Sequence, residues 1–280
     1  MTTYPDLYVA WVDLLDRLVN APQYAIAPRG HGTRERLVES FTIEDLRANI
    51  IVSEARNVNH RFMVAEWLWI AFGRNDVETI AQYNARWREF SDDGVTFAGA
   101  YGPRVLDQLR YIIDKLREDP HTRQAVMTMW KPSPPPSKDI PCTISLQFLL
   151  RDEALHVIAT MRSSDAWLGV PYDVFTFSMI ANAIAGELRV APGSLTMQLG
   201  SSHLYDEHLE AACRVLAESE GGDGYTLWSP ALPAAPPFSL EPVLVRGTGS
   251  GPGDELWGAY ADVLVDTRAN ALSHLERIER

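Results

Sequence analysis

Cysteine is scarce in this sequence: Cys142 and Cys213 are the only two among 280 residues, and they lie far apart. Two distant cysteines provide neither a disulfide framework nor the spacing of a metal site. We therefore expect no bound metal, and the simplest compartment for the chain is the reducing cytoplasm.

Long apolar runs are absent as well. Residues 1–20 are amphipathic and carry acids, unlike the basic start and unbroken apolar segment of a secretory signal. No later run approaches the roughly 20 apolar residues that span a bilayer. The sequence therefore predicts neither a signal peptide nor a membrane helix.

Positive charge is also in short supply. The chain has 25 lysines and arginines against 37 aspartates and glutamates, a formal net charge of −12 at pH 7. Proteins that grip DNA or RNA without sequence preference neutralise phosphates with a basic surface. A polymeric nucleic acid is therefore disfavoured as a partner, whereas a small anionic ligand remains open where arginines gather locally.

The rest of the composition is that of a globular chain, long enough for one large core or two modest domains. Apolar spacing predicts helices near residues 4–20, 103–117, 176–188, 208–218 and 255–279. It predicts strands near residues 125–130, 144–150, 154–161 and 195–199, with a hairpin across 151–153. Glycine and proline make residues 131–138 and most of 219–255 loop. We find no internal repeat.

The segment 140–150 places Cys142 directly after Pro141 and before an alternation of apolar and polar residues typical of a strand. Pro141 restricts its own backbone and that of the preceding residue, so the thiol would be held at the start of the strand. Taken alone, a buried cysteine that serves as a small apolar side chain is the favoured interpretation.

Two further segments suggest a ligand site. Residues 27–34 hold two glycines around His31 with arginines on either side, which suits a phosphate, although a solvated loop is the simpler interpretation. In the apolar run 62–72, Glu66 is the one acid. A carboxylate among tryptophans is costly unless it is paired or functional; the alternative is a position on the solvated side of a helix.

Four stretches taken together resemble the thymidylate synthase family. They are Pro141-Cys142, then Arg162-Ser163-Ser164-Asp165 with Leu168-Gly169-Val170-Pro171-Tyr172, then Leu199-Gly200 with His203-Leu204-Tyr205, and the upstream Tyr101-Gly102. Their order and spacing match over about residues 25–215. The resemblance implies an α+β fold and a single catalytic domain over residues 1–280. It also implies one large sheet covered by helices and packed against the sheet of a second copy in a homodimer.

The resemblance implies that Cys142 is the nucleophile that adds to C6 of a pyrimidine, which makes C5 nucleophilic. A thiolate needs nearby positive charge, and Arg162 is similar to the family arginine that serves both the cysteine and the phosphate. Arg29 and Ser163 resemble further phosphate ligands. Arg123 resembles an arginine that reaches the phosphate of the neighbouring subunit, although Gln124 stands where a second arginine is common.

Other matched residues imply the remaining roles. Glu66 resembles the general acid–base carboxylate, and Tyr101 a companion that orders water. His203 and Tyr205 match residues that hold the sugar 3′-hydroxyl. The co-substrate 5,10-methylenetetrahydrofolate would be contacted by the residues at the folate positions, which are Arg56, Trp87 and Asp165.

Asp173 departs from the family pattern, which has asparagine after the proline–aromatic pair. Asparagine offers one acceptor and one donor, which match uracil, whereas an ionised aspartate offers only acceptors. Cytosine presents an amino donor at N4 and an N3 that can be protonated, so a carboxylate favours cytosine. In this respect the chain is similar to the cytidylate hydroxymethylases. A helix N-cap at Asp173 is the alternative.

Two more departures from the family pattern also favour a hydroxymethylase. Thr143 replaces the histidine that usually follows the catalytic cysteine, and the polar residues 273–280 lack the apolar tail that closes over the folate in thymidylate synthases. Water would then reach the exocyclic methylene and leave a hydroxymethyl group, and tetrahydrofolate would be released without being oxidised.

The sequence therefore predicts a one-carbon transferase, a pyrimidine nucleotide C5 hydroxymethylase acting on CMP or dCMP, in which Asp173 selects and polarises cytosine. The alternatives are a thymidylate synthase that methylates dUMP and a non-catalytic nucleotide-binding member of the fold. Ribose and deoxyribose substrates both stay open, and so does the pathway, either modification of DNA precursors or synthesis of a nucleoside natural product.

Overall fold

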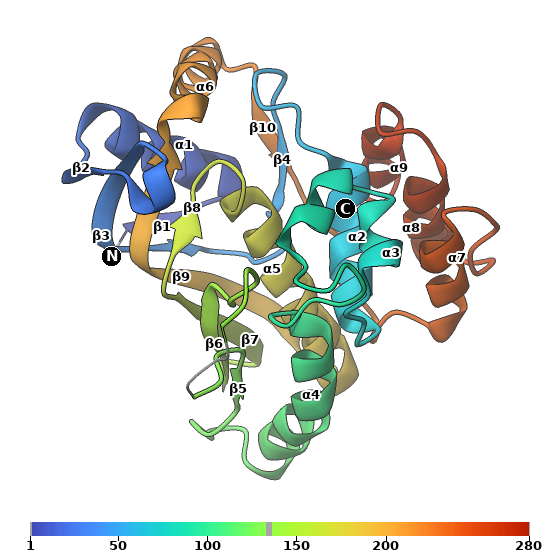
Figure 1. Cartoon of the computed structure of the whole chain (residues 1–280). Helices are drawn as coiled ribbons and strands as arrows, with labels where there is room; N and C mark the ends of the chain where they lie inside the picture. Colours follow the sequence, from blue (N-terminus) through green and yellow to red (C-terminus); the bar gives the residue numbers. More distant parts are fainter. Residues whose placement is uncertain (1, 133–135, 280) are drawn as a thin grey trace.

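An eight-stranded mixed sheet forms the centre of the protein, for which a computed structural model describes residues 2–132 and 136–279 (Figure 1). The order across the sheet is β1 (Thr2–Tyr4), β3 (Thr33–Ile43), β9 (Ala191–Tyr205), β7 (Ala154–Met161), β6 (Thr143–Arg151) and β5 (Val126–Thr128), with β2 (Tyr24–Ile26) beside β3 and β8 (Ser164–Asp165) beside β9. β3 and β9 are antiparallel, β9 and β7 are parallel, and β6 and β7 form the predicted hairpin. A separate antiparallel pair joins β4 (Ile50–Val52) to β10 (Tyr225–Leu227).

One face of the sheet is covered by helices, and the described residues leave the other face open. On β7, Leu155, Val157, Ala159 and Met161 are buried, whereas the residues between them are only half-buried. Because successive side chains of a strand point to opposite faces, the buried set marks the covered face. Helices α1 (Leu7–Asn20) and α5 (Val170–Leu188) pack there.

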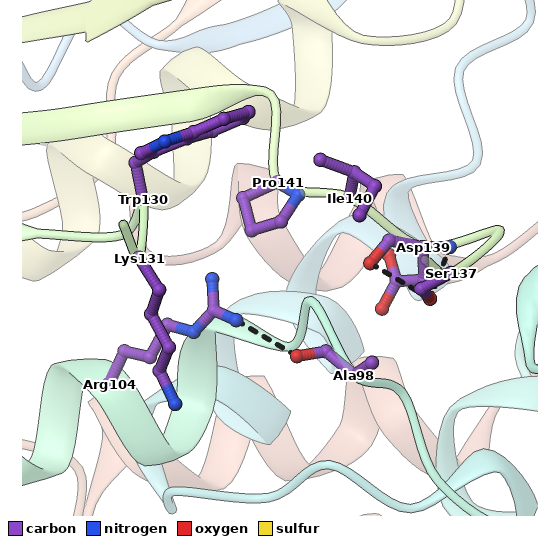
Figure 2. Close-up of a pocket in the computed structure, with 8 residues that line it drawn as sticks. All are labelled: Ala98, Arg104, Trp130, Lys131, Ser137, Asp139, Ile140 and Pro141. Carbon is purple, nitrogen blue, oxygen red and sulfur yellow. Dashed lines mark hydrogen bonds between the residues drawn. The ribbon is translucent and has the colours of Figure 1, made fainter. Parts of the chain in front are cut away.

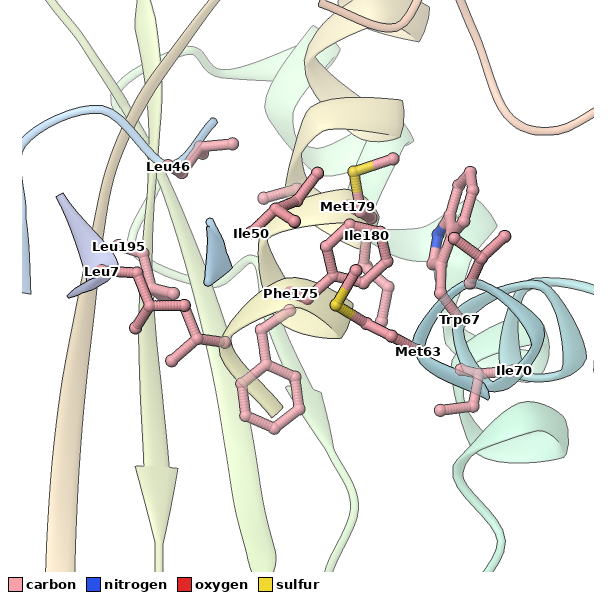
Figure 3. Packing of buried hydrophobic residues seen from close by; sticks show 14 of the residues in the cluster. Leu7, Leu46, Ile50, Met63, Trp67, Ile70, Phe175, Met179, Ile180 and Leu195 are labelled. Atoms are coloured by element: carbon pink, nitrogen blue, oxygen red, sulfur yellow. The ribbon is translucent and has the colours of Figure 1, made fainter. Parts of the chain in front are cut away.

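Helix α5 lies at the centre of the core, between the sheet and α2 (His60–Ala71). Its buried residues extend all round the helix, as expected for a helix without a solvent face. Figure 3 shows Phe175 and Met179 of α5 between Leu195 of β9 and the α2 residues Met63 and Trp67. The amphipathic helix α4 (Tyr101–Glu118) packs against both α2 and α5.

The C-terminal helices lie beside α2 (Figure 1). They are α7 (Glu241–Arg246), α8 (Glu255–Val265) and α9 (Ala271–Glu276); the other helices are α3 (Val77–Ala81) and α6 (Leu209–Gly221). Arg61 of α2 donates two hydrogen bonds to the Leu264 carbonyl at the end of α8, at 2.9 and 2.7 Å. Trp67 of α2 stacks on Trp257 of α8. Within the described ranges, no helix is long and apolar enough to cross a membrane.

Some helix limits differ from the expected ones. Helix α5 begins at Val170 rather than at residue 176, because Gly169 is its N-cap and the first turn of a helix tolerates Pro171. Asp173 therefore lies inside the first turn, and the N-cap alternative is wrong. The helix expected over residues 255–279 is two helices, separated by residues 266–270. Within the expected loop 131–138, residues 133–135 lie outside the described residues.

Candidate active site

A cavity of about 590 Å³ is lined by residues of α2, α4, α5, β8, β9 and the segment that precedes β6. It brings together all the predicted site residues except Arg123. These are Arg29, Arg56, Glu66, Trp87, Tyr101, Cys142, Arg162, Ser163, Asp165, Asp173, His203 and Tyr205.

Arg162 holds the segment that carries Cys142. Its Nε donates to the Pro141 carbonyl at 2.9 Å, and its Nη2 donates to the Ile140 carbonyl at 3.1 Å. Nη2 also lies 3.8 Å from Cys142 Sγ. The guanidinium group is therefore fixed beside the thiol, as the sequence predicts.

The thiol of Cys142 is nevertheless held in its neutral form. Burial raises its pKa, and the opposing effect of Arg162 is countered by the negative charges of Asp173, Asp139 and Asp165. The expectation that Arg162 is enough to stabilise the thiolate is therefore incomplete. Burial raises the pKa of the thiol more than one neighbouring cation lowers it. A nucleophilic role for this sulfur would require removal of the thiol proton.

Two carboxylates face the same cavity. Oε2 of Glu66 is buried without a hydrogen-bond partner among the described residues, so a solvated position for Glu66 is wrong. Burial, followed by the charge of Asp173, raises the pKa of Glu66 well above its ordinary value. Burial, followed by the charge of Asp165, raises the pKa of Asp173 to about 7. Near neutral pH this pair therefore holds protons as well as negative charge.

Gly169 provides the space for the Asp173 side chain. A Cβ at this position would lie 3.0 Å from Asp173 Oδ2 and 2.9 Å from the Asp165 carbonyl oxygen. Any side chain would therefore displace either the carboxylate or the backbone of β8.

The Tyr101 hydroxyl accepts two hydrogen bonds from Thr143, one from the backbone N–H at 3.1 Å and one from Oγ1 at 3.0 Å. With its oxygen engaged as an acceptor, the phenol keeps its own proton for donation into the cavity. Burial, then the charges of Asp173 and Cys142, raise the pKa of Tyr101, so the phenol stays protonated. Thr143 thus orients Tyr101 as a hydrogen-bond donor.

A small cavity of about 100 Å³ lies behind Pro141, and Figure 2 shows the side chains that line it. Arg104 of α4 donates to the Ala98 carbonyl at 2.8 Å and also to the Met129 carbonyl. These bonds tie the start of α4 to the end of β5, on either side of the segment that leads to Cys142. These bonds therefore support the segment that carries Cys142.

The residues predicted to hold phosphate and sugar line the same cavity. Arg29 is exposed in the short turn Pro28–Gly30 and has a positive φ of 54°. His203 and Tyr205 of β9 have ring centroids 5.2 Å apart, and burial lowers the pKa of His203. His31, which sequence reasoning placed only in a loop, lies edge-on to Tyr205 with centroids 6.0 Å apart.

Aromatic rings form another wall. Trp87 packs against Phe62, Trp69 and Phe97 with centroids 5.5, 6.1 and 5.4 Å away. Such a surface suits a flat ring system. The carboxylate of Asp165 is engaged by the backbone that follows it, because its Oδ1 accepts from the N–H groups of Trp167 at 2.7 Å and Leu168 at 2.9 Å.

Sequence reasoning missed several lining residues, which are Asn59, Arg86, Phe90, Phe97 and Arg268. Arg86 and Arg88, on either side of Trp87, could have signalled an anion site. No local pattern marks Arg268, because it lies in a turn where a continuous helix was expected.

Arg123 is exposed and lies away from the cavity of its own chain. The described part of the chain contains no group of three or more His, Cys, Asp or Glu side chains that could hold a metal ion.

Comparison with known proteins places most of the chain in one family. A family profile described as thymidylate synthase matches residues 10–223. The chain is 34% identical over 215 residues to the deoxyuridylate hydroxymethyltransferase of Bacillus phage SP01, covering 70% of this chain and 56% of the phage protein. It is 35% identical over 164 residues to the protein of the same name from Pseudomonas phage M6, covering 55% of this chain and 47% of that protein.

A thymidylate synthase of Francisella philomiragia is 26% identical over 188 residues, covering 59% of this chain and 69% of that protein. The chain spans about half the length of the two phage relatives. The matched region contains every predicted site residue, and the C-terminal helices α7–α9 lie outside it.

Proposed function

The chain belongs to the thymidylate synthase family, and we propose that it adds a hydroxymethyl group to C5 of a cytidine 5′-monophosphate, CMP or dCMP. The observation that carries the choice of base is Asp173. Its carboxyl group is buried in the wall of the cavity that contains Cys142, and none of the described protein groups lowers its pKa by a hydrogen bond. A buried carboxyl group that receives no hydrogen bond from the protein suits a ligand that donates one.

Cytosine satisfies this carboxyl group with a single shared proton. The N4 amino group donates to one oxygen, and the proton lies between the other oxygen and N3. When the proton is on N3, the contact is a charge-assisted hydrogen bond, and the ring is more open to attack at C6. Uracil cannot form the contact in which a proton moves onto N3, because its N3 already carries hydrogen. Its O4 also repels an ionised Asp173.

In this proposal, residues of this chain carry out the chemical steps at the pyrimidine ring. Cys142 Sγ bonds to C6 as its proton passes to an ionised carboxylate of the Glu66 and Asp173 pair, and the displaced electron pair makes C5 nucleophilic. When bound, 5,10-methylenetetrahydrofolate supplies the one-carbon unit, and the aromatic wall and cationic rim of the cavity fit its rings and carboxylates. In its ionised form Glu66, whose raised pKa makes it a stronger base than an ordinary carboxylate, accepts the C5 proton, and Tyr101 orders the water that provides the hydroxyl oxygen. Elimination of Cys142 restores the ring, and tetrahydrofolate leaves without being oxidised.

The other site residues position the two substrates in this proposal. Arg29, Arg162 and Ser163 bind the phosphate, and His203 and Tyr205 hold the sugar hydroxyl. Trp87, Arg56 and Asp165 contact the folate. Arg123 serves the site of a second copy in a homodimer, and a reducing cytoplasm keeps Cys142 as a free thiol.

Hydroxymethylation of dUMP is the second candidate, because two relatives are named deoxyuridylate hydroxymethyltransferase. A protonated Asp173 offers one donor and one acceptor, as asparagine does, and so matches uracil. A pKa of about 7 leaves this form populated at neutral pH.

Incubation with CMP, dCMP, UMP and dUMP tests the proposal. Each nucleotide is supplied with 5,10-methylenetetrahydrofolate. The mass of the product distinguishes hydroxymethyl transfer from methyl transfer, and the absorbance of the mixture shows whether dihydrofolate is formed. We expect hydroxymethylated cytidylate without dihydrofolate. Methylation of dUMP with dihydrofolate formed would identify a thymidylate synthase instead. The variant Cys142→Ala should bind nucleotide without turnover, whereas unchanged turnover would refute the covalent step.

A further inference from the structure

The residues on both sides of Cys142 are bonded to the start of α4. Asp139, which precedes the cysteine, accepts from the Gly99 N–H through Oδ2 at 2.6 Å. Thr143, which follows it, donates its N–H and its Oγ1 hydroxyl to the Tyr101 hydroxyl at 3.1 and 3.0 Å. The chain is therefore attached to residues 99–101 both before and after the thiol.

Gly99 lets the two segments approach closely enough for the first of these bonds. A Cβ on Gly99 would lie 2.6 Å from the Asp139 carbonyl oxygen and 2.9 Å from Asp139 Cγ. Side-chain atoms do not pack at such distances, so any other residue would push the segments apart. The Asp139 carboxylate thus occupies the space that a side chain at position 99 would need.

Asp139 is held by its own surroundings. Its N–H donates to Ser137 Oγ at 3.0 Å. Burial raises the pKa of Asp139, whereas the Gly99 N–H and the charge of Arg104 favour the ionised carboxylate. A hydrogen bond to an ionised carboxylate is stronger than one between neutral groups. The bond from Gly99 is therefore a firm attachment of the segment that leads to Cys142.

The attachment after the thiol depends on an irregularity of β6. The register of β6 against β7 shifts between Thr143 and Ser145, and such bulges redirect the groups beside them. Thr143 is fully buried, so water does not compete for its two donors. With Tyr101 and Cys142 lining the same cavity, the two attachments fix the thiol relative to the phenol.

We propose that Asp139 is a positioning residue for Cys142: through Gly99 it holds the segment of the thiol against the start of α4, and its charge helps to keep the resting sulfur protonated. This inference rests on the proposed function for the role of Cys142 as nucleophile, and it is independent of the base. Asp173 and Asp165 act on the thiol in the same direction as Asp139, and Arg162 acts against them. Because a neutral thiol reacts slowly with electrophiles, the resting site is protected from alkylation.

Two substitutions separate the bond from the charge. Asp139→Asn keeps an oxygen that accepts from the Gly99 N–H but removes the charge, whereas Asp139→Ala removes both. Hydrogen exchange of the Thr143 amide, followed by NMR, reports the attachment without turnover. We expect this exchange to be about tenfold faster in Asp139→Ala and within about twofold of wild type in Asp139→Asn. For the nucleotide that the chain modifies, kcat should fall about tenfold in Asp139→Ala alone, with KM within about twofold.

Alkylation of Cys142 by iodoacetamide at about pH 7 reports the charge, and peptide masses count the two cysteines separately. Asp139→Asn should react about threefold faster than wild type at Cys142, because one fewer negative charge favours the thiolate. Cys213 is exposed and should react equally in all variants. Asp107→Asn and Asp107→Ala are the matched controls, because Asp107 is an exposed acid of α4 that does not line the cavity.

Unchanged Thr143 exchange in Asp139→Ala, or an equal loss of kcat in Asp139→Asn and Asp139→Ala, would overturn the positioning role. Unchanged alkylation of Cys142 in Asp139→Asn would overturn the role of the charge. A chain that methylates dUMP, or that modifies no nucleotide, would refute the proposed function alone, and the exchange and alkylation rates would still decide this inference.

Discussion

Asp173 and Glu66 are two buried acids in one cavity, and the protons they share determine what the site can bind. Neither lies within 4.0 Å of an arginine or lysine nitrogen among the described residues. After burial, the charge of Asp173 raises the pKa of Glu66, and the charge of Asp165 raises the pKa of Asp173. A base edge that brings an amino donor relieves this unfavourable charge, which is the physical reason for assigning cytosine to this site.

Asp173→Asn should transfer activity from cytidylates to uridylates. An amide has one donor and one acceptor. When its NH2 group faces O4 of uracil and its oxygen accepts from N3–H, the same orientation repels the N4 amino group of cytosine. Two mismatched buried polar groups cost roughly 1–3 kcal/mol each, so we expect kcat/KM for cytidylates to fall by about 100-fold or more. Asp139→Asn is the control, because Asp139 also lines the cavity but accepts from the Gly99 N–H at 2.6 Å. Unchanged cytosine preference in Asp173→Asn would refute the role of Asp173.

The same substitution should make stability less dependent on pH. Because the pKa of Asp173 is raised to about 7, its contribution to stability is fully present below the unfolded-state pKa and is lost as pH rises through 7. The amide side chain of the variant cannot ionise, so Asp173→Asn should stabilise the chain more at about pH 8 than at about pH 5, by roughly 2 kcal/mol. Urea unfolding at both pH values measures this difference, and an equal effect at both would show that Asp173 is not buried as an acid.

At the scale of elements, helix α2 connects the cavity to the C-terminal helices. It presents Glu66 to the cavity on one side and Trp67 to the C-terminal helices on the other. Trp67 packs on Trp257 and Tyr260 of α8 with ring centroids 6.4 and 5.2 Å away. The position of the acid therefore depends on a helix that lies outside the family match.

Trp257→Ala should lower both stability and activity. The indole is buried, and removing a buried tryptophan costs about 3–5 kcal/mol. We expect the free energy of unfolding to fall by about 3 kcal/mol and kcat to fall while nucleotide affinity changes little. Trp228→Ala is the control, because Trp228 is 36% exposed. Similar losses in the two variants would argue against a specific support of α2.

The elements that could be predicted from the sequence are those with a strong local pattern. Helix α4 has one apolar face, and the β6–β7 hairpin alternates clearly, so both were expected within a few residues. The start of α5 was missed because proline usually marks a boundary, yet Pro171 stands where a first turn accepts it. The place of Glu66 in the site could be predicted because an acid within an apolar run is costly unless it is paired or functional. The place of Arg268 could not, because it depends on a turn that only the packing of α8 and α9 defines.

At the scale of the whole molecule, the open face of the sheet is the surface that a second copy would cover. Half-buried Gln147 of β6 pairs with Ile158 of β7 on this face. Gln147 Nε2 donates to the Arg123 carbonyl at 3.1 Å, which places Arg123 at the border of the open face. An exposed arginine there can reach across to a partner's cavity when two sheets pack against each other.

Mixing two inactive variants tests whether sites are shared between copies. Arg123→Ala should lose phosphate affinity, and Cys142→Ala should lose chemistry. After subunit exchange, a mixed dimer has one complete site, in which Cys142 of one chain receives Arg123 from the other. Random exchange of equal amounts makes half the dimers mixed, so activity should recover to roughly a quarter of the wild-type level. Arg29→Ala mixed with Cys142→Ala is the control, because Arg29 lines the cavity of its own chain and no complete site can form. Recovery in the control, or none in the first mixture, would show that each chain builds its site alone.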